Sequence, residues 1–263
     1  MKFVIYGPSD VFRSSGSAVI RGGQVVYALQ HKNIPDIKFQ CIQKLPDIHD
    51  SFVVCVKDNR LDINGLKVLK KHNNKIIFDV LDYYDIKTHD TPDIIKNGFN
   101  EYIDMFVVNN EYMRKEFEKY KKPIYVIPHH YDIRLNKVDL KKNTELKFIF
   151  NGYRGATNRN CLYLKELKQH YNLIENELFL NFMNKMLASN YCFVSIREEG
   201  SWEFNNRPGM KLAHAAACDS NIIITNDMSV RDLLDPSYPY LLKDSKYETV
   251  VEMMEYVKKT FNT

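Results

Sequence analysis

The sequence has no uninterrupted apolar stretch that approaches the roughly 20 residues of a membrane-spanning helix. Residues 1–7 are too short for the apolar centre of a secretory signal peptide, so we expect them to form a first strand. With 44% hydrophobic and 27% charged residues, the composition is that of an ordinary soluble globular chain. Its 263 residues suffice for one large domain or two medium ones.

Cysteine is scarce, and no two cysteines lie at the spacing of metal ligands. The total is five, an odd number, and Cys55, Cys192 and Cys218 lie in apolar runs. We expect these three to be buried thiols, and a reducing, cytoplasmic compartment is the simple inference. No Asp-x-Asp pair stands out after a predicted strand, so we expect no metal site.

The glycine-rich fingerprints of two nucleotide-binding classes are also missing. The first predicted strand is not followed by G-x-G-x-x-G with an acidic residue near the next strand end, which disfavours a Rossmann-type oxidoreductase. No G-K-[ST] follows Ser15, Gly16 and Ser17, so their loop matches a phosphate loop only weakly. The net charge of +4 and the pI of about 8.6 permit an anionic ligand or nucleic acid but require neither.

What the chain does contain is an alternation of short apolar runs with helix-forming segments. We expect strands at 2–6, 37–42, 51–56, 75–80, 103–108, 124–127, 146–150, 191–196 and 221–225. We expect helices from 18 onward and at 63–71, 92–98, 111–120, 161–169, 175–187, 210–218, 230–234 and 247–261. Strands that alternate with helices predict right-handed crossovers and parallel sheets.

Residues 133–145 are polar and charged without a clear apolar period, and we interpret them as an interdomain connection. The prediction is an α/β chain of two doubly wound, Rossmann-like domains, residues 1–133 and 134–263, that face each other across a cleft. Ligands of such sheets bind beyond the carboxyl ends of the strands. We therefore expect the chemistry in the loops that follow strands.

One segment, residues 207–225, carries the clearest site signal. A turn at Pro208 and Gly209 precedes an alanine-rich helix and then an apolar strand. We expect Arg207 and Lys211 in the first helical turn, four residues apart and on one face. Two cations there oppose the helix dipole unless an anion lies between them, so the pattern indicates a phosphate site. A solvated basic pair is the structural alternative.

Several motifs resemble the GT-B nucleotide-sugar glycosyltransferases, nearest to their large retaining group of the family-four type. Residues 104–110 with Tyr125-Val-Ile-Pro-His-His-Tyr-Asp132 resemble the interdomain signature, and Phe148-Ile-Phe-Asn-Gly-Tyr-Arg154 resembles the opening of the second domain. Lys211-x-x-x-Ala215-x-x-x-Asp219-x-Asn-Ile-Ile-Ile224 resembles the donor-site helix. That group has two glutamates eight residues apart, and Asn206 and His214 stand in their places here, which leaves retention or inversion open.

The resemblance implies transfer of a hexosyl or pentosyl group from a nucleotide diphosphate sugar, without metal or other cofactor. Cations near the donor diphosphate would stabilise the charge of the leaving group; the candidates are Arg207, Lys211 and Arg154. The candidates for nucleotide or sugar contacts are His214, Asn206, Gly152, Trp202 and Glu199. Surface exposure or plain packing is the alternative for each of them.

In the first domain, Asp10 and Asp82 follow strands and are candidates for the general base, although turn aspartates are also common. The acceptor-side candidates are Ser15, Gly16, Ser17 and His129. The acceptor is a glycan or a small molecule by default, and a hydroxymethylated base of phage or viral DNA is a further candidate. A binding module that kept the fold without catalysis is the rival interpretation.

Overall fold

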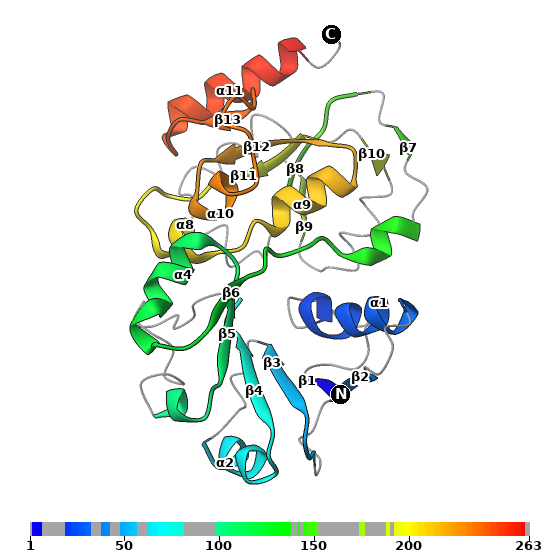
Figure 1. Cartoon of the computed structure of the whole chain (residues 1–263). Helices are drawn as coiled ribbons and strands as arrows, with labels where there is room; N and C mark the ends of the chain where they lie inside the picture. The colour runs from blue at the N-terminus through cyan, green and yellow to red at the C-terminus, as the bar shows by residue number, and fades with distance from the viewer. Residues whose placement is uncertain are drawn as a thin grey trace. The chain divides into compact units, whose positions relative to one another are not determined.

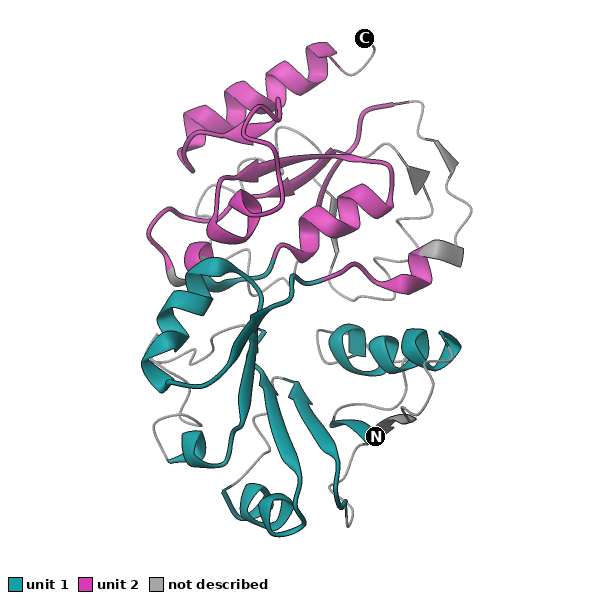
Figure 2. Ribbon diagram, viewed as in Figure 1, with its two compact units in different colours: residues 1–129, 206–208 teal, residues 130–205, 209–263 magenta. Residues whose placement is uncertain are grey.

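In the computed structural model of this chain, the described residues are 2–6, 19–32, 38–42, 48–56, 63–81, 98–137, 141–142, 145–151, 174–176, 188–189 and 192–260. The chain divides into two compact units (Figure 2), residues 1–129 with 206–208 and residues 130–205 with 209–263. The sequence placed the boundary after residue 133. Each unit is built on a parallel sheet (Figure 1), so the predicted α/β class is confirmed.

The sheet of unit 1 has six strands, at or within two residues of the predicted positions. They are β1 (Lys2–Tyr6), β2 (Lys38–Ile42), β3 (Phe52–Val56), β4 (Lys75–Asp79), β5 (Met105–Val108) and β6 (Ile124–Val126). Their spatial order is β2-β1-β3-β4-β5-β6. The chain therefore reverses its winding between β1 and β3, which is the switch point of a doubly wound sheet.

The helical segments of unit 1 also follow the sequence pattern. They are η1 (Val19–Gln24), α1 (Val25–His31), α2 (Ile63–Lys71), η2 (Phe99–Glu101), α4 (Glu111–Phe117) and η3 (Glu118–Tyr120). Leu66 and Leu69 of α2 are buried, as predicted. The expected helix at 92–98 lies outside the described residues except for its last position, which is a turn.

The glycine pair inside the first helix lies in the π-helix Val19–Gln24, which packs against β1. A Cβ on Gly22 would lie 3.4 Å from Cγ2 of Ile5 in β1, which is an ordinary van der Waals contact. On the opposite face, α2 and α4 cover a core that includes Phe106 and Phe117, whose rings meet edge to face.

The main sheet of unit 2 has five strands. They are β8 (Phe148–Asn151), β9 (Ile174–Asn176), β11 (Cys192–Ser195), β12 (Asn221–Thr225) and β13 (Leu241–Leu242), in the order β13-β12-β11-β8-β9. If these five strands are numbered 1 to 5 along the chain and read from the β9 edge, their order in the sheet is 2-1-3-4-5. The first five strands of unit 1 have the same order. The switch point lies between β8 and β11. Two further short strands, β7 (Lys141–Lys142) and β10 (Ala188–Ser189), pair separately.

The helices of unit 2 are η4 (Ile133–Lys137), α8 (Trp202–Asn206), α9 (Met210–Ala217), α10 (Met228–Arg231) and α11 (Tyr247–Thr260). The helix expected from 175 was wrong at its start, because residues 174–176 pair with β8 as a strand. Pairing with β8 outweighed the weak helical preference of these residues. Residues 161–169 and 177–187 lie outside the described residues. The sequence missed α8, β7, β10 and β13.

Two apolar layers enclose this sheet. Phe148, Val194 and Met254 belong to the layer on the α11 side, and Ile149 and Phe193 to the layer that includes α9. The three cysteines expected to be buried are at most 1% exposed, so that prediction is confirmed. Within the described ranges, no helix is long and apolar enough to span a membrane.

Candidate functional site

The switch point of unit 2 carries a cation. Lys211 places its Nζ atom 4.1 Å from the ring centroid of Phe150, the next-to-last residue of β8. On the other strand of the switch point, Ser195 ends β11, and its hydroxyl is buried without a hydrogen-bond partner among the described residues. A doubly wound sheet binds its ligand at this place. The arrangement therefore offers a positive charge where an anionic ligand is expected.

Helix α9 begins at its predicted first residue, Met210, with Gly209 at the N-cap and no side-chain cap. Arg207 therefore precedes the helix and does not share a face with Lys211, so this part of the prediction was wrong. The reason is Pro208, because a residue before proline is disfavoured in helical conformation. Arg207 belongs to unit 1 and Lys211 to unit 2.

His214 lies one turn after Lys211 and is fully buried. Its Nε2 atom accepts the backbone N–H of Asp132 at 3.1 Å. Burial lowers the pKa of His214 to about 4, and the nearby Asp132 carboxylate opposes this shift only in part. The imidazole is therefore neutral at pH 7. Asp132 is buried as well, and its Oδ2 atom accepts from Arg134 at 2.6 Å.

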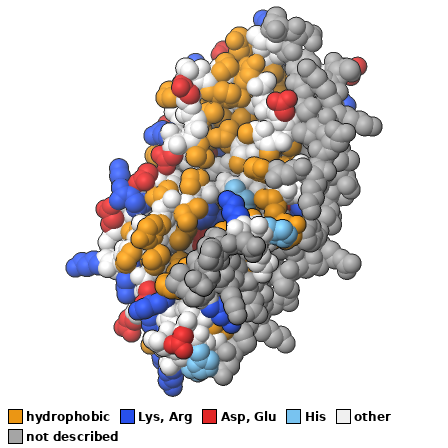
Figure 3. Space-filling view, turned by 45° about the vertical axis from the view of Figure 1, so that its right-hand side comes forward, with side chains coloured by type: hydrophobic (Ala, Val, Ile, Leu, Met, Phe, Trp, Pro, Cys, Tyr) orange, Lys and Arg blue, Asp and Glu red, His pale blue; other side chains and the backbone are white. Residues whose placement is uncertain are grey.

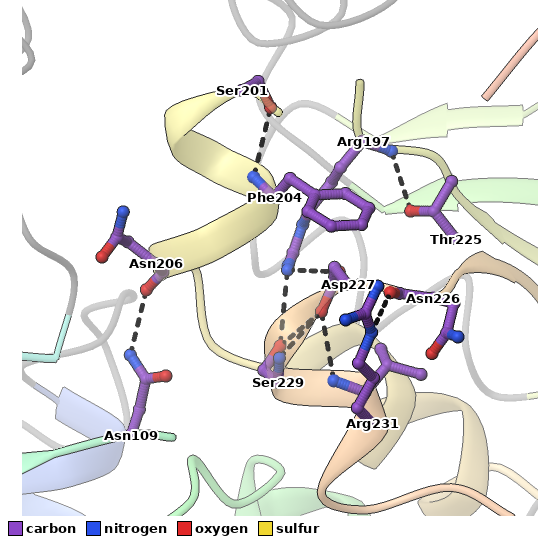
Figure 4. Close-up of polar contacts among 11 residues, drawn as sticks. Asn109, Arg197, Ser201, Phe204, Asn206, Thr225, Asn226, Asp227, Ser229 and Arg231 are labelled. Atoms are coloured by element: carbon purple, nitrogen blue, oxygen red, sulfur yellow. Dashed lines mark hydrogen bonds and ion pairs between the residues drawn. The ribbon is translucent and has the colours of Figure 1, made fainter. Parts of the chain in front are cut away.

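A buried ion pair that the sequence did not reveal lies beyond β11 and β12 (Figure 4). Arg197 donates to Oδ2 of Asp227 at 2.6 Å, and its backbone N–H donates to Oγ1 of Thr225 at 3.1 Å. Asp227 uses Oδ1 to cap α10 at the N–H groups of Ser229 and Val230. A cation directly after a buried strand and an aspartate at a helix start were the signals that could have found this pair.

Unit 1 has its own buried ion pair at the carboxyl end of β4. Arg21 donates from Nε to Asp79 at 2.8 Å and from a second nitrogen at 3.1 Å. Its third nitrogen donates to the carbonyl oxygens of Ile127 and Pro128 at 2.7 and 2.9 Å. Both partners are 5% exposed. Because the guanidinium holds both oxygens of Asp79, this carboxylate is engaged in structure and is a poor general base.

A side-chain amide ties two other parts of unit 1. Asn109 donates to the carbonyl oxygens of Leu81 and of Asn206, the latter at 3.1 Å. The structure thus brings the backbone of the predicted site residue Asn206 close to that of Leu81, two residues after β4. His129 is buried, 3% exposed, at the end of unit 1.

The remaining predicted residues fall into two groups. Glu199 is exposed in the turn before α8, and Trp202 is the first residue of α8. The others lie outside the described residues, and their roles stay predictions: Asp10, Asp82, Ser15, Gly16, Ser17, Gly152 and Arg154.

No family model matches the chain. Among solved structures, Anabaena HepE in complex with UDP and glucose aligns over 99% of this chain and 90% of its own, with a TM-score of 0.56 and 8% identity. The pneumococcal O-GlcNAc transferase GtfA, solved with UDP and GlcNAc, aligns over 92% of this chain and 52% of its own, with a TM-score of 0.47 and 11% identity.

A putative ankyrin repeat protein of Borreliella burgdorferi is 24% identical to this chain over 147 residues, which are 56% of this chain and 33% of that protein. The chain thus spans about a third of the length of this curated relative. The likeness to HepE, together with the two parallel sheets, shows that the chain has the Rossmann-like fold of the GT-B glycosyltransferases. The resemblance seen in the sequence is confirmed at the level of the fold.

Proposed function

We propose that the chain is a glycosyltransferase that moves a sugar from a nucleotide diphosphate sugar to an acceptor hydroxyl. The observation that carries the proposal is the ammonium group of Lys211 beside Phe150 at the switch point of unit 2. It stands in a chain that shares its fold with HepE, a protein solved with UDP and glucose. An anionic diphosphate fits the position of Lys211 at the switch point and its positive charge.

The chemistry asks for positive charge at the leaving group. As the bond between sugar and diphosphate breaks, negative charge grows on the diphosphate, and fixed cations and N–H donors nearby stabilise it. Lys211 supplies one cation, and the first N–H groups of α9 lack acceptors within the helix. Arg207 and Arg154 complete the proposed diphosphate site. Because these cations neutralise the diphosphate, the proposed reaction uses no metal ion and no other cofactor.

The other roles follow the same proposal. Asp82 is the proposed general base, with Asp10 as its alternate, and His129 and the Ser15, Gly16, Ser17 loop serve the acceptor. The nucleotide or sugar is contacted by His214, Asn206, Gly152, Trp202 and Glu199. The transferred group is a hexosyl or a pentosyl.

For the acceptor we propose a glycan or a small molecule. DNA binding relies on a run of lysine and arginine that follows the phosphates. On the face shown in Figure 3, basic and acidic side chains of the described residues are interspersed, without a single basic stripe. HepE, which shares the fold, is solved with UDP and glucose.

A non-catalytic binding module is the second candidate, and His214 favours it. This residue stands where the resembling group has the glutamate that holds the donor ribose. It is fully buried and bonded to Asp132. A module of this kind binds the nucleotide but neither transfers nor hydrolyses the sugar.

The test is thermal unfolding with UDP, GDP, ADP, CDP and their glucose conjugates. A ligand at 100 times its Kd stabilises the folded protein by about 2.7 kcal/mol, which is visible as a rise in Tm. We expect one base to raise the Tm of the wild type and to raise it much less in Lys211→Ala. Lys243→Ala, which removes an exposed lysine of the same unit, is the control. Absence of any shift in the folded wild type contradicts the proposal, and binding without hydrolysis or transfer selects the module.

A further inference from the structure

One buried side chain in unit 1 holds the backbone at two points that are far apart in the sequence. Asn109 follows β5 and is 3% exposed. Its Nδ2 atom donates to the carbonyl oxygen of Leu81 and, at 3.1 Å, to that of Asn206 (Figure 4 shows the second bond). A side-chain amide has two hydrogens in one plane, so one asparagine can serve both carbonyls. The sulfur of Met113 also lies 3.1 Å from this nitrogen.

The first of these points is strained backbone at Leu81, two residues after β4. Leu81 is fully buried and has φ of +54°, a left-handed conformation that a branched side chain rarely adopts. Val80 just before it still continues the sheet, since its N–H donates to Val107 at 2.9 Å. The backbone is thus held at both residues, by the sheet at Val80 and by Asn109 at Leu81. From here the chain continues directly to Asp82.

The second point is the end of α8. Asn206 is its last residue and is 8% exposed. It opens the three-residue segment 206–208, which belongs to unit 1 although the residues on both sides belong to unit 2. The bond from Asn109 to the Asn206 carbonyl holds the backbone immediately before Arg207.

The hydrogen bonds of this asparagine use only the nitrogen of its amide. Its Oδ1 atom is buried and has no hydrogen-bond partner among the described residues. A buried acceptor without a partner lowers stability, and such atoms in native proteins call for an explanation. Strained backbone at Leu81 points the same way, because residues in rare conformations cluster at functional sites.

We propose that Asn109 is a positioning residue of the transfer reaction. Its amide holds the carbonyl oxygens of Leu81 and Asn206, the residues that immediately precede the proposed base Asp82 and the proposed diphosphate ligand Arg207 in the sequence. The inference rests on the proposed function. It adds a residue that touches neither donor nor acceptor and acts through the two segments it holds.

The neighbouring residue provides a matched control. Asn110 is fully buried as well, but its side chain accepts the N–H of Met113 at 2.8 Å and caps α4. Loss of this cap destabilises the helix but removes neither the bond to Leu81 nor the bond to Asn206. Asn109→Leu keeps the size of the side chain and removes both donors, and Asn109→Ser is a smaller change in case the first variant fails to fold.

The experiment compares these variants with the wild type in Tm, in the Kd of the nucleoside diphosphate that the wild type binds, and in kcat for hydrolysis of its glucose conjugate. We expect Asn109→Leu and Asn109→Ser to lower kcat by about 100-fold, as a displaced catalytic group does, and to weaken the Kd. We expect Asn110→Ala to lower Tm about as much as the Asn109 variants do, while its kcat and Kd stay within about twofold of wild type.

Two results overturn the inference in different ways. If the Asn109 variants lose Tm but keep kcat and Kd as Asn110→Ala does, Asn109 is structural only and the proposed function stands. If the folded wild type neither binds a nucleoside diphosphate nor hydrolyses a conjugate, the proposed function fails and takes this inference with it.

Discussion

His214 accepts the backbone N–H of Asp132 through Nε2 at 3.1 Å, although 82 residues separate the two in the sequence. The bond joins α9 to the first residues of unit 2. It also fixes the tautomer, since Nε2 must be unprotonated to accept, which leaves the proton on Nδ1. A protonated imidazole would lose this bond and place a buried charge in the core.

The buried imidazole makes stability depend on pH. The pKa of His214 is about 4 in the folded protein, against a usual 6.5. Below pH 6.5 the unfolded chain binds a proton that the folded chain refuses, so stability falls as the pH drops from 6.5 toward 4. We expect this group to lower the free energy of unfolding by about 2 kcal/mol between pH 7 and pH 5. Urea unfolding at several pH values measures it.

His214→Gln is the matching variant, because its side chain keeps a hydrogen-bond acceptor and cannot titrate. We expect the loss of stability below pH 6.5 to shrink by the same amount in this variant. His31→Gln changes an exposed histidine and should leave the pH dependence as in the wild type. An equal pH dependence in wild type and His214→Gln would show that this imidazole is not the cause.

Removing one member of the Arg21–Asp79 pair should lower the free energy of unfolding more than replacing both members with apolar residues. Removing one member leaves the other charge buried without its partner, which typically costs about 3–5 kcal/mol. We therefore expect Asp79→Leu and Arg21→Met each to lower the free energy of unfolding by about that much. The double variant should recover a large part of the loss. Urea unfolding of the four proteins gives the coupling energy.

If the double variant lost the sum of the unfolding free energies lost by the two single variants, the two side chains would not be energetically coupled, and the prediction would be wrong. Arg21 also donates to the carbonyl oxygens of Ile127 and Pro128, so the double variant should not regain the whole loss. Lys258→Met, which removes an exposed lysine paired with Glu255 on α11, serves as control. Surface pairs of this kind contribute about 0–1 kcal/mol.

Donor binding should not respond to a chelator. In the proposed site, Lys211 and two arginines supply the positive charge that other sites obtain from a divalent cation. We expect the Kd of the nucleoside diphosphate to stay within twofold when EDTA is added and when magnesium is restored. Titration calorimetry under the three conditions measures this. A Kd that weakens tenfold in EDTA and recovers with magnesium would require a metal at the diphosphate.

Much of the fold was accessible from the sequence because its strands are short apolar runs with polar ends. β12 was predicted at its observed bounds, Asn221–Thr225. Such a run is buried on both faces wherever it sits in a parallel sheet, so its local pattern suffices. The strand β9 was missed because Ile174-Glu175-Asn176 has no such pattern and becomes a strand only by pairing with β8.

The candidate site was accessible only in part. The sequence marked Lys211 by its place in a helix that leads into a buried strand, and the structure puts it beside Phe150. The sequence also placed Arg207 in this helix, but Pro208 disfavours a helical conformation at Arg207, and the helix begins only at Met210. It gave no sign of Asn109, since an asparagine after a strand is ordinary and the two carbonyl oxygens that accept from it lie 28 and 97 residues away.

The sequence by itself determined that strands and helices alternate, that the sheets are parallel, and that Cys55, Cys192 and Cys218 are buried. These features follow from local apolar patterns, which act wherever the chain finds a core. Only the tertiary structure decided the order of the strands, the partner of Arg21, the neutral state of His214 and the anchoring of Leu81. Each of these depends on a contact between residues far apart along the chain, and such contacts exist only once both segments have packed.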